Sequence, residues 1–292
     1  MGGTKPGSSS ETADLQSSKD LREDRPVSFQ LQQDDIRKYQ DDGVVCLRGV
    51  IDRDLCERML DATIDFADNG EGDKHDFPED SGGRYFFGID MNKTVPAFHE
   101  FAFDTVLPKV AGGLMQSKAV RFFYDQVFLV EPGTKRATPW HNDLAYWPFD
   151  GGDIVSLWVA LTDVTSESSP LQYLAGSHRD GKMYRAVGPG DSDGPVDTTF
   201  ERSPDYSDPA NQEGKRILSW EMRPGDVLAH HPLALHGSHA NRTKGQRRCG
   251  LSLRYLGDDV RYNPSDRLRE RNYNVPAGAY PADDANLPPI AI

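Results

Sequence analysis

The second half of the chain is divided into short stretches rich in β-branched and aromatic residues, and this pattern limits the fold more than any other feature. Six such stretches lie at 119–130, 153–161, 170–174, 216–222, 226–231 and 249–256. Clusters of Pro, Gly, Asp and Asn separate them, as is typical of strands joined by turns. We therefore predict an antiparallel β-barrel or jelly roll for this half.

The first 115 residues have a different pattern, because their apolar side chains recur at helical spacing. We predict helices at about 31–42, at 54–67 and over most of 98–115, with a buried strand at 44–50. The polar, glycine-rich stretch 69–83 is predicted to be a loop. The chain is thus expected to be mainly β with N-terminal helices.

The division of the chain follows from these two patterns. Residues 1–27 combine Ser, Gly and mixed charges with few apolar side chains, so we expect a disordered tail. Residues 28–292 are expected to form a single domain, with a helical part to about 115, a jelly-roll core at about 118–262 and a C-terminal extension. The acidic stretch 187–216 has little periodicity, which indicates a long insertion that either covers a site or is mobile.

Charge and composition limit the partners of this chain. It carries 33 basic and 46 acidic residues, a net charge of −13, which argues against binding nucleic acid. We expect no membrane partner, because no stretch approaches the roughly 18 consecutive apolar residues of a membrane span. Cys46, Cys56 and Cys249 form neither an even disulfide set nor a close metal pair. We expect a cytoplasmic protein that acts on a small molecule as a monomer or homodimer.

A His-x-Asp motif follows the first strand predicted in the second half. In an extended chain, His141 and Asp143 point to the same side. His236 follows 95 residues after His141, at the end of the stretch AHHPLALH. Two histidines and one carboxylate are the ligand set of non-haem Fe(II) oxygenases, and they leave coordination positions open. We predict that these three residues bind a metal and form the catalytic centre.

Three other histidines compete as ligands, namely His230, His231 and His239. His230 shares a strand face with His236 only if the chain stays extended through Pro232, and proline disfavours that. We interpret His231 and His239 as satisfied polar or surface residues. The sequence leaves the place of His230 open.

In the stretch RRCGLSLRYL at 247–256, arginines and small residues alternate with apolar residues. One face of the predicted strand carries Arg248, Gly250, Ser252 and Arg254. An arginine is suited to a dicarboxylate ligand, because its planar donors bind a carboxylate through two parallel hydrogen bonds. The residues alone are equally compatible with an exposed arginine at the end of a strand.

From about Leu31 to Tyr262, the sequence resembles the phytanoyl-CoA dioxygenase-like family of iron(II)- and 2-oxoglutarate-dependent oxygenases. The resemblance rests on five segments taken together: WHNDLAYWP (140–148), VSLWVALTDV (155–164), PLQYLAGSHR (170–179), RPGDVLAHHPLALHGSHAN (223–241) and RRCGLSLRYLGDD (247–259). It implies a double-stranded β-helix, a distorted and cupin-like jelly roll. It also implies a dioxygenase that uses Fe(II), 2-oxoglutarate and O2 to hydroxylate an unactivated C–H of a small organic metabolite, releasing succinate and CO2.

The resemblance also implies roles for single residues. It places Fe(II) on His141, Asp143 and His236. It places 2-oxoglutarate against Ser238, Trp158 and an arginine of the last core strand.

Two arginines compete for this last role. Counting from His236 favours Arg247, whereas aligning the strand on Ser252 favours Arg248. We choose Arg248, because it shares a face with the small residues Gly250 and Ser252, which leave room for a bound dicarboxylate.

The substrate is the least determined feature of the sequence. We predict contacts from Gln126, Tyr146, Trp147 and Arg254, with the aromatic run at 84–88 nearby, which suits an apolar or ring-containing molecule. Aromatic residues at such spacing are also common in protein cores. No basic cluster matches a phosphate-binding surface, so a coenzyme A thioester is not favoured over a free small metabolite.

Two alternative functions keep the same fold. One is a zinc- or manganese-dependent jelly-roll hydrolase or isomerase, which needs neither a dicarboxylate-binding arginine nor O2. The other is a non-catalytic jelly roll that only binds a ligand.

Overall fold

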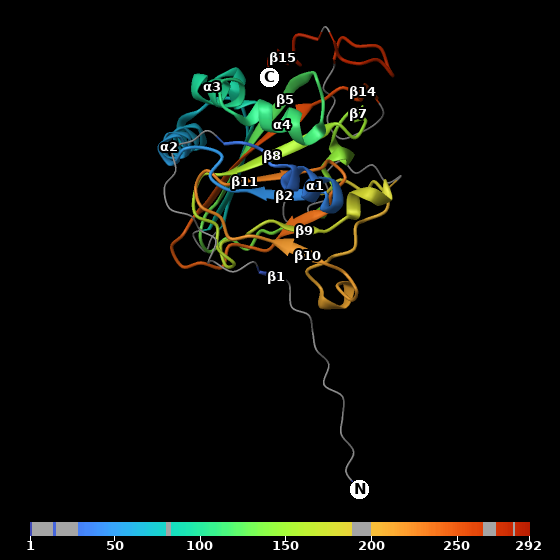
Figure 1. The fold of residues 1–292 in the computed structure, drawn as a ribbon. Helices are drawn as coiled ribbons and strands as arrows, with labels where there is room; N and C mark the ends of the chain where they lie inside the picture. The colour runs from blue at the N-terminus through green and yellow to red at the C-terminus, as the bar shows by residue number, and fades with distance from the viewer. Residues whose placement is uncertain (2–13, 16–28, 80–82, 189–199, 265–272, 283) are drawn as a thin grey trace.

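The computed structural model describes residues 1, 14–15, 29–79, 83–188, 200–264, 273–282 and 284–292. Two β-sheets form its centre, with helices packed against the larger one (Figure 1). This arrangement is a jelly roll with N-terminal helices, so the predicted fold class is confirmed. The predicted tail at 1–27 lies almost wholly outside the described residues.

The larger sheet runs in the order β2-β11-β8-β13-β5-β4-β3, and β15 also pairs with β5. All of these pairs are antiparallel. The strands are β2 (Val44–Leu47), β3 (Asp73–Pro78), β4 (Arg84–Ile89), β5 (Val120–Val130), β8 (Ile154–Ala160), β11 (Val227–His230), β13 (Arg248–Leu256) and β15 (Pro289–Ile290).

The smaller sheet runs in the order β1-β10-β9-β12-β6. Its strands are β1 (Asp14–Leu15), β6 (Thr138–His141), β9 (Gln172–Leu174), β10 (Ile217–Ser219) and β12 (His236–Ser238). A further pair is formed by β7 (Phe149–Asp150) and β14 (Arg261–Tyr262). Short 3-10 helices lie at η2 (Met91–Lys93), η3 (Asp143–Tyr146), η4 (Ser177–Asp180) and η6 (Pro209–Asn211).

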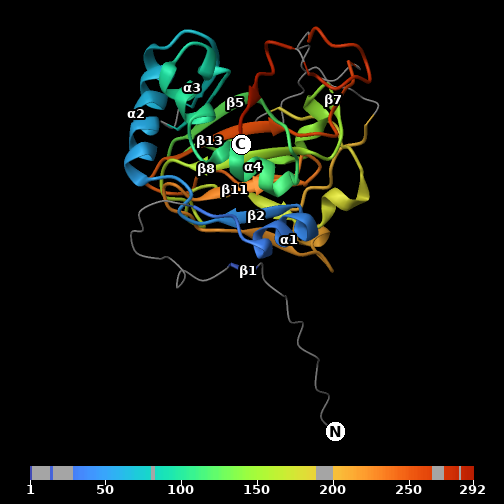
Figure 2. The same ribbon diagram turned by 45° about the horizontal axis from the view of Figure 1, so that its top comes forward.

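In the described ranges, four α-helices cover the outer side of the larger sheet, and they lie where the sequence predicts helices. They are α1 (Gln33–Asp42), α2 (Arg53–Asn69), α3 (Pro96–Phe103) and α4 (Leu107–Met115). Figure 2 shows α4 across the larger sheet, with α1 next to β2 at one end of the helical layer and with α2 and α3 at the other. Both α3 and α4 carry a proline in the first turn, where the missing N–H has no helical partner to lose. No helix in the described ranges is long and apolar enough to cross a bilayer.

Side-chain alternation in β13 divides the larger sheet into two faces. The face toward the helices belongs to the main apolar core and carries Cys249, Leu251, Leu253 and Tyr255. The opposite face carries Arg248, Gly250, Ser252 and Arg254. All of these residues are buried, so β13 has no solvent-exposed side.

One prediction for the N-terminal half is wrong. Within the stretch predicted as a loop, residues Asp73–Pro78 form β3, which pairs with β4 at the edge of the larger sheet. The ring of His75 stacks on Phe87 at 4.4 Å between centroids, and Phe77 also packs against Phe87 at 6.1 Å. An edge strand needs only one row of ladder hydrogen bonds and one covered face, so pairing outweighs its polar composition.

Gly225 holds the turn that leads into β11. Its φ is 92°, and a Cβ at this position would lie 2.0 Å from the carbonyl oxygen of Ile51. The Gly225 carbonyl also accepts the backbone N–H groups of Val50 and Ile51, at 2.9 and 3.1 Å. The turn thus joins the chain after β2 to the chain before β11.

We predict that Gly225→Ala lowers the free energy of unfolding by about 2–4 kcal/mol, because it combines an unfavourable φ with a backbone clash. Urea denaturation monitored by circular dichroism measures this change. Gly245→Ala is the matched control, because a Cβ at Gly245 would meet nothing within 4 Å. Equal unfolding midpoints for the two variants would contradict the role of this turn.

Candidate active site

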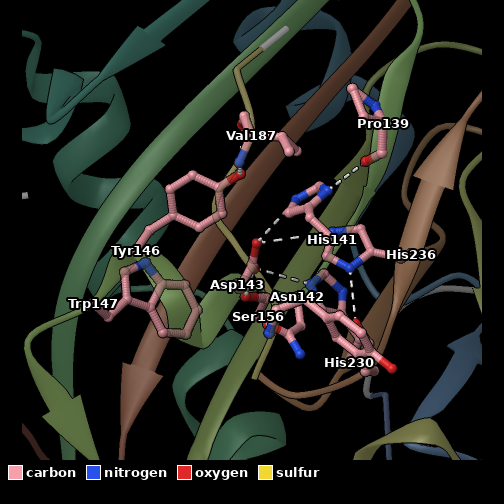
Figure 3. Close-up of polar contacts among 12 residues, drawn as sticks. Pro139, His141, Asn142, Asp143, Tyr146, Trp147, Ser156, Val187, His230 and His236 are labelled. Atoms are coloured by element: carbon pink, nitrogen blue, oxygen red, sulfur yellow. Dashed lines mark hydrogen bonds and ion pairs between the residues drawn. The ribbon is translucent and has the colours of Figure 1, made fainter. Parts of the chain in front are cut away.

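Antiparallel pairing of β6 with β12 brings two distant histidines together. His141 lies directly opposite His236 in the ladder, and their ring centroids are 4.3 Å apart. Asp143 begins η3 immediately after β6, so its carboxylate turns back toward both rings (Figure 3). Asp143 Oδ1 lies 3.6 Å from His141 Nε2 and 3.8 Å from His236 Nε2. The three side chains thus each offer one ligand atom, and all three atoms lie within 4.8 Å of one another.

Backbone carbonyls orient both imidazole rings. His141 Nδ1 lies 2.7 Å from the carbonyl oxygen of Pro139, and His236 Nδ1 lies 3.0 Å from that of Ala234. With Nδ1–H donating to each carbonyl, Nε2 keeps its lone pair and faces Asp143. Burial lowers the pKa of His236 well below its ordinary value, so this ring is neutral, as a metal ligand must be.

The two oxygens of Asp143 have different surroundings. Oδ2 accepts a hydrogen bond from Ser156 Oγ at 3.0 Å and lies 3.3 Å from His230 Nε2, whereas Oδ1 faces the two ligand histidines. Burial acts to raise the pKa of Asp143, but the contacts with His141 and His230 and the nearby positive charge hold it well below its usual range. The carboxylate is therefore ionised, with Oδ1 available to a metal ion.

His230 lies inside the site, a position that the sequence leaves open. It ends β11 opposite Ser156 of β8, on the face of the larger sheet that points to the site. Tyr173 Oη lies 3.1 Å from His230 Nδ1, so one tautomer lets Tyr173 donate to His230 and His230 donate to Asp143. This forms a hydrogen-bond chain from β9 to the carboxylate.

The histidines interpreted as polar or surface residues make hydrogen bonds elsewhere. His231 Nδ1 accepts the backbone N–H of Leu233 at 3.1 Å, and burial lowers the pKa of His231 to about 3. His239 Nε2 lies 2.9 Å from the carbonyl oxygen of Ser166.

A cavity of about 400 Å³ opens beside the three candidate ligands. Its wall is largely aromatic, from Tyr85, Phe87, Tyr124, Phe128, Tyr146 and Trp158. Its polar groups besides the histidines and Asp143 include Gln126, Arg248, Ser252 and Arg254. A mostly apolar pocket with a few convergent polar groups is typical of a small-molecule site.

Arg248 lines the cavity and is not fully hydrogen-bonded within the described part of the chain. The residue is 2% exposed, its Nε has no hydrogen-bond partner among the described residues, and its guanidinium lies 4.9 Å from the Trp158 ring centre. Gly250 makes this packing possible, because a Cβ there would lie 1.8 Å from the Trp158 ring. Arg247 instead turns away and pairs with Glu131 at 2.9 Å. Of the two arginines that the sequence leaves in competition, the one on the cavity wall is thus Arg248.

The other predicted contact residues fall into two groups. Gln126, Tyr146 and Arg254 line the cavity. Ser238 and Trp147 are buried next to it: the Ser238 hydroxyl accepts a hydrogen bond from Ser169 Oγ at 3.1 Å, and Trp147 Nε1 donates to Tyr124 Oη at 2.9 Å. Trp147 therefore packs behind an aromatic side chain of the wall.

Several residues of this wall were not predicted from the sequence. Tyr124 and Phe128 alternate with Gln126 along β5, so the period of two that points Gln126 inward could have identified them. His75 comes from the strand that was predicted to be a loop.

The predicted insertion at 187–216 begins at the cavity. The Tyr146 hydroxyl accepts the backbone N–H of Val187 at 2.7 Å and donates to the Val187 carbonyl at 2.5 Å (Figure 3). Val187 and Gly188 line the cavity, and residues 189–199 lie outside the described residues. Farther along, the ring of Tyr206 packs against Trp140 at 5.2 Å. The insertion therefore contacts both the cavity and the residue before His141.

Comparison with known proteins extends these observations. A probable phytanoyl-CoA dioxygenase from Caenorhabditis elegans is 32% identical over 123 residues, which cover 42% of this chain and 37% of that protein. An L-proline trans-4-hydroxylase from Streptomyces griseoviridis is 32% identical over 138 residues, covering 41% and 48%. The chain thus spans less than half the length of these curated relatives.

Solved structures share the fold over most of the chain. The non-haem α-ketoglutarate-dependent carbocyclase SnoK from nogalamycin biosynthesis superposes with a TM-score of 0.69 at 19% identity, covering 89% of this chain and 97% of that one. The epimerase SnoN in complex with Fe3+, α-ketoglutarate and nogalamycin RO gives a TM-score of 0.67 at 22% identity, covering 88% and 97%.

Residues 39–249 match the family model of phytanoyl-CoA dioxygenase (PhyH). This match covers most of the chain and includes His141, Asp143, His236 and Arg248. The chain therefore belongs to the phytanoyl-CoA dioxygenase family.

Proposed function

We propose that this protein is an Fe(II)- and 2-oxoglutarate-dependent dioxygenase that hydroxylates an unactivated C–H of a small organic metabolite. The observation that carries the proposal is one cavity lined both by the cluster of His141, Asp143 and His236 and by the buried Arg248, whose Nε has no hydrogen-bond partner within the described ranges. Family membership supports it.

The residues present suit these cofactors. Two imidazole nitrogens and one carboxylate oxygen match the donor set of non-haem Fe(II) sites, which leave positions open for other ligands. A buried cation without a partner is costly unless an anion neutralises it, and the distal carboxylate of 2-oxoglutarate would do so at Arg248. When bound, Fe(II) and 2-oxoglutarate with O2 supply the oxidation of a C–H bond, with succinate and CO2 as coproducts.

The protein itself has three tasks in this proposal. The carbonyls of Pro139 and Ala234 fix the ring orientation of the two ligand histidines. Arg248 would bind the distal carboxylate of 2-oxoglutarate, with Trp158 packed against its guanidinium. The aromatic wall would hold an apolar or ring-containing substrate and exclude water from the reacting groups.

Several narrower expectations stay predictions. Ser238 is one of the predicted 2-oxoglutarate contacts. It lies beside the cavity without lining it, and its hydroxyl accepts a hydrogen bond from Ser169 Oγ. Four other points also remain predictions: the division into a tail and a single domain, the cytoplasmic location, the choice between monomer and homodimer, and hydroxylation as the outcome of the reaction.

Anaerobic titration with Fe(II) and 2-oxoglutarate tests the proposal directly. We predict a weak visible metal-to-ligand charge-transfer band for the wild type and no band for His236→Ala. Arg248→Ala should need about 10- to 100-fold more 2-oxoglutarate, because it loses a charged hydrogen-bonded pair.

Arg247→Ala is the matched control for this titration, because Arg247 pairs with Glu131 outside the cavity. It should titrate like the wild type. Fully iron-loaded wild type without a band would refute the proposal and favour the zinc, manganese or ligand-binding alternatives.

We also predict that the hydrogen-bond chain behind Asp143 controls metal affinity. His230→Phe removes the donor to Oδ2, and loss of such an outer contact weakens metal binding by about 10- to 100-fold. Mn(II) binding followed by electron paramagnetic resonance measures this change without turnover. Tyr173→Phe, which removes only the hydroxyl next to His230, should have a smaller effect. An unchanged Mn(II) affinity in His230→Phe would show that Asp143 is oriented without this donor.

A further inference from the structure

A second buried arginine on the cavity wall has no strong partner. Arg254 is 3% exposed and lies on the same face of β13 as Arg248. Its Nε has no hydrogen-bond partner among the described residues. Its Nη1 lies 3.5 Å from the Ser252 carbonyl oxygen, and its guanidinium carbon lies 4.5 Å from the centre of the Tyr124 ring. These are weak contacts for a buried positive charge.

Arg254 faces Asp143, but the two side chains do not form a close pair. Asp143 Oδ2 lies 4.0 Å from Arg254 Nη2, which is beyond hydrogen-bond distance. The same oxygen already accepts from Ser156 and lies within reach of His230. Arg254 therefore keeps donors that are available to a ligand.

The charge balance of the cavity indicates what that ligand is. The described wall carries two arginine cations, Arg248 and Arg254, and one carboxylate, Asp143. Fe(II) would add two positive charges and 2-oxoglutarate two negative ones, so the loaded site keeps an excess of one positive charge. A substrate with a single negative charge would neutralise it, whereas a neutral substrate would leave a buried cation unpaired.

The surroundings of Arg254 indicate the rest of the ligand. In the pairing of β13 with β5, Arg254 lies opposite Tyr124 and Ser252 lies opposite Gln126. The guanidinium thus packs against an aromatic ring of the wall, and the amide of Gln126 lines the same cavity. A carboxylate fits the planar donors of arginine, and a ring or another apolar body fits the wall.

We propose that the substrate is a small aromatic or otherwise apolar monocarboxylate whose carboxylate group binds Arg254, while Arg248 is reserved for 2-oxoglutarate. This inference rests on the proposed function, because the charge balance counts both cofactors. It assigns each buried arginine to a different anion.

Calorimetry on the full chain tests the assignment with no need for turnover. The Mn(II)-loaded protein is titrated anaerobically with benzoate, phenylacetate, 3-phenylpropanoate and 4-phenylbutanoate, with and without 2-oxoglutarate. The corresponding amides are the neutral controls. We expect at least one carboxylate to bind the wild type at least about 10-fold more tightly than its amide, because a charge-assisted pair is lost in the amide.

Two variants then separate the two anions. Arg254→Met should weaken carboxylate binding about 10- to 100-fold and leave 2-oxoglutarate binding within a few-fold of the wild type. Arg248→Met should show the reverse. Arg247→Met, which lies outside the cavity, should change neither. Retained 2-oxoglutarate binding also shows that Arg254→Met is folded. If that variant does not fold, Arg254→Gln, which keeps a polar side chain, takes its place.

The outcomes separate this inference from the proposed function. Equal binding of carboxylates and amides, no binding of any carboxylate, or loss of carboxylate binding in Arg248→Met alone would overturn the inference even where 2-oxoglutarate binds normally. Failure of the wild type to bind 2-oxoglutarate, with carboxylate binding still dependent on Arg254, would instead reject the proposed function and keep the anion site.

Discussion

Strand β13 lies between β8 and β5 in the middle of the larger sheet, and both of its faces are buried. A strand in this position cannot send polar side chains to water, so each face needs partners inside the protein. The face toward the helices meets this need with apolar side chains that join the main core. The opposite face carries two arginines, and partners within the described residues satisfy them only in part. The cavity is therefore lined by buried charges that a bound anion could neutralise.

The same sheet also determines the geometry at the candidate metal ligands. Ser156 and His230, from the neighbouring strands β8 and β11, face one another in the ladder and both contact Asp143 Oδ2. The smaller sheet supplies the two candidate ligand histidines from paired strands. Asp143 thus lies where the two sheets meet, with Oδ2 toward the larger sheet and Oδ1 toward the smaller. This division explains how a single carboxylate can be fixed in place and still present one oxygen to a metal ion.

Period-two alternation explains how much of this arrangement the sequence predicts. The β-rich stretches separated by turn residues predict the jelly roll. Alternation within a strand separates Arg248 from Arg247, because adjacent residues of a strand point to opposite faces. The place of His230 does not follow from the chain between His230 and His236, which is interrupted by Pro232. His230 reaches the site through its sheet neighbour on β8 instead. Strand β3 was missed because its stability comes from pairing with β4 rather than from its own composition. Local sequence patterns carry no information about contacts between strands that are distant in sequence.

Unpaired buried charge also bears on selectivity. The folded protein already carries the desolvation cost of both guanidiniums before any ligand arrives, so a ligand that supplies an anion recovers part of that cost on binding. A neutral analogue of the same shape recovers none of it and leaves the arginine unpaired, which is how a polar site rejects molecules that an apolar pocket alone would accept. The aromatic wall provides affinity for many ring-containing molecules. In such a site, the arginines determine which of those molecules stay bound. Only a ring-containing anion can both pack against the aromatic wall and neutralise a guanidinium charge.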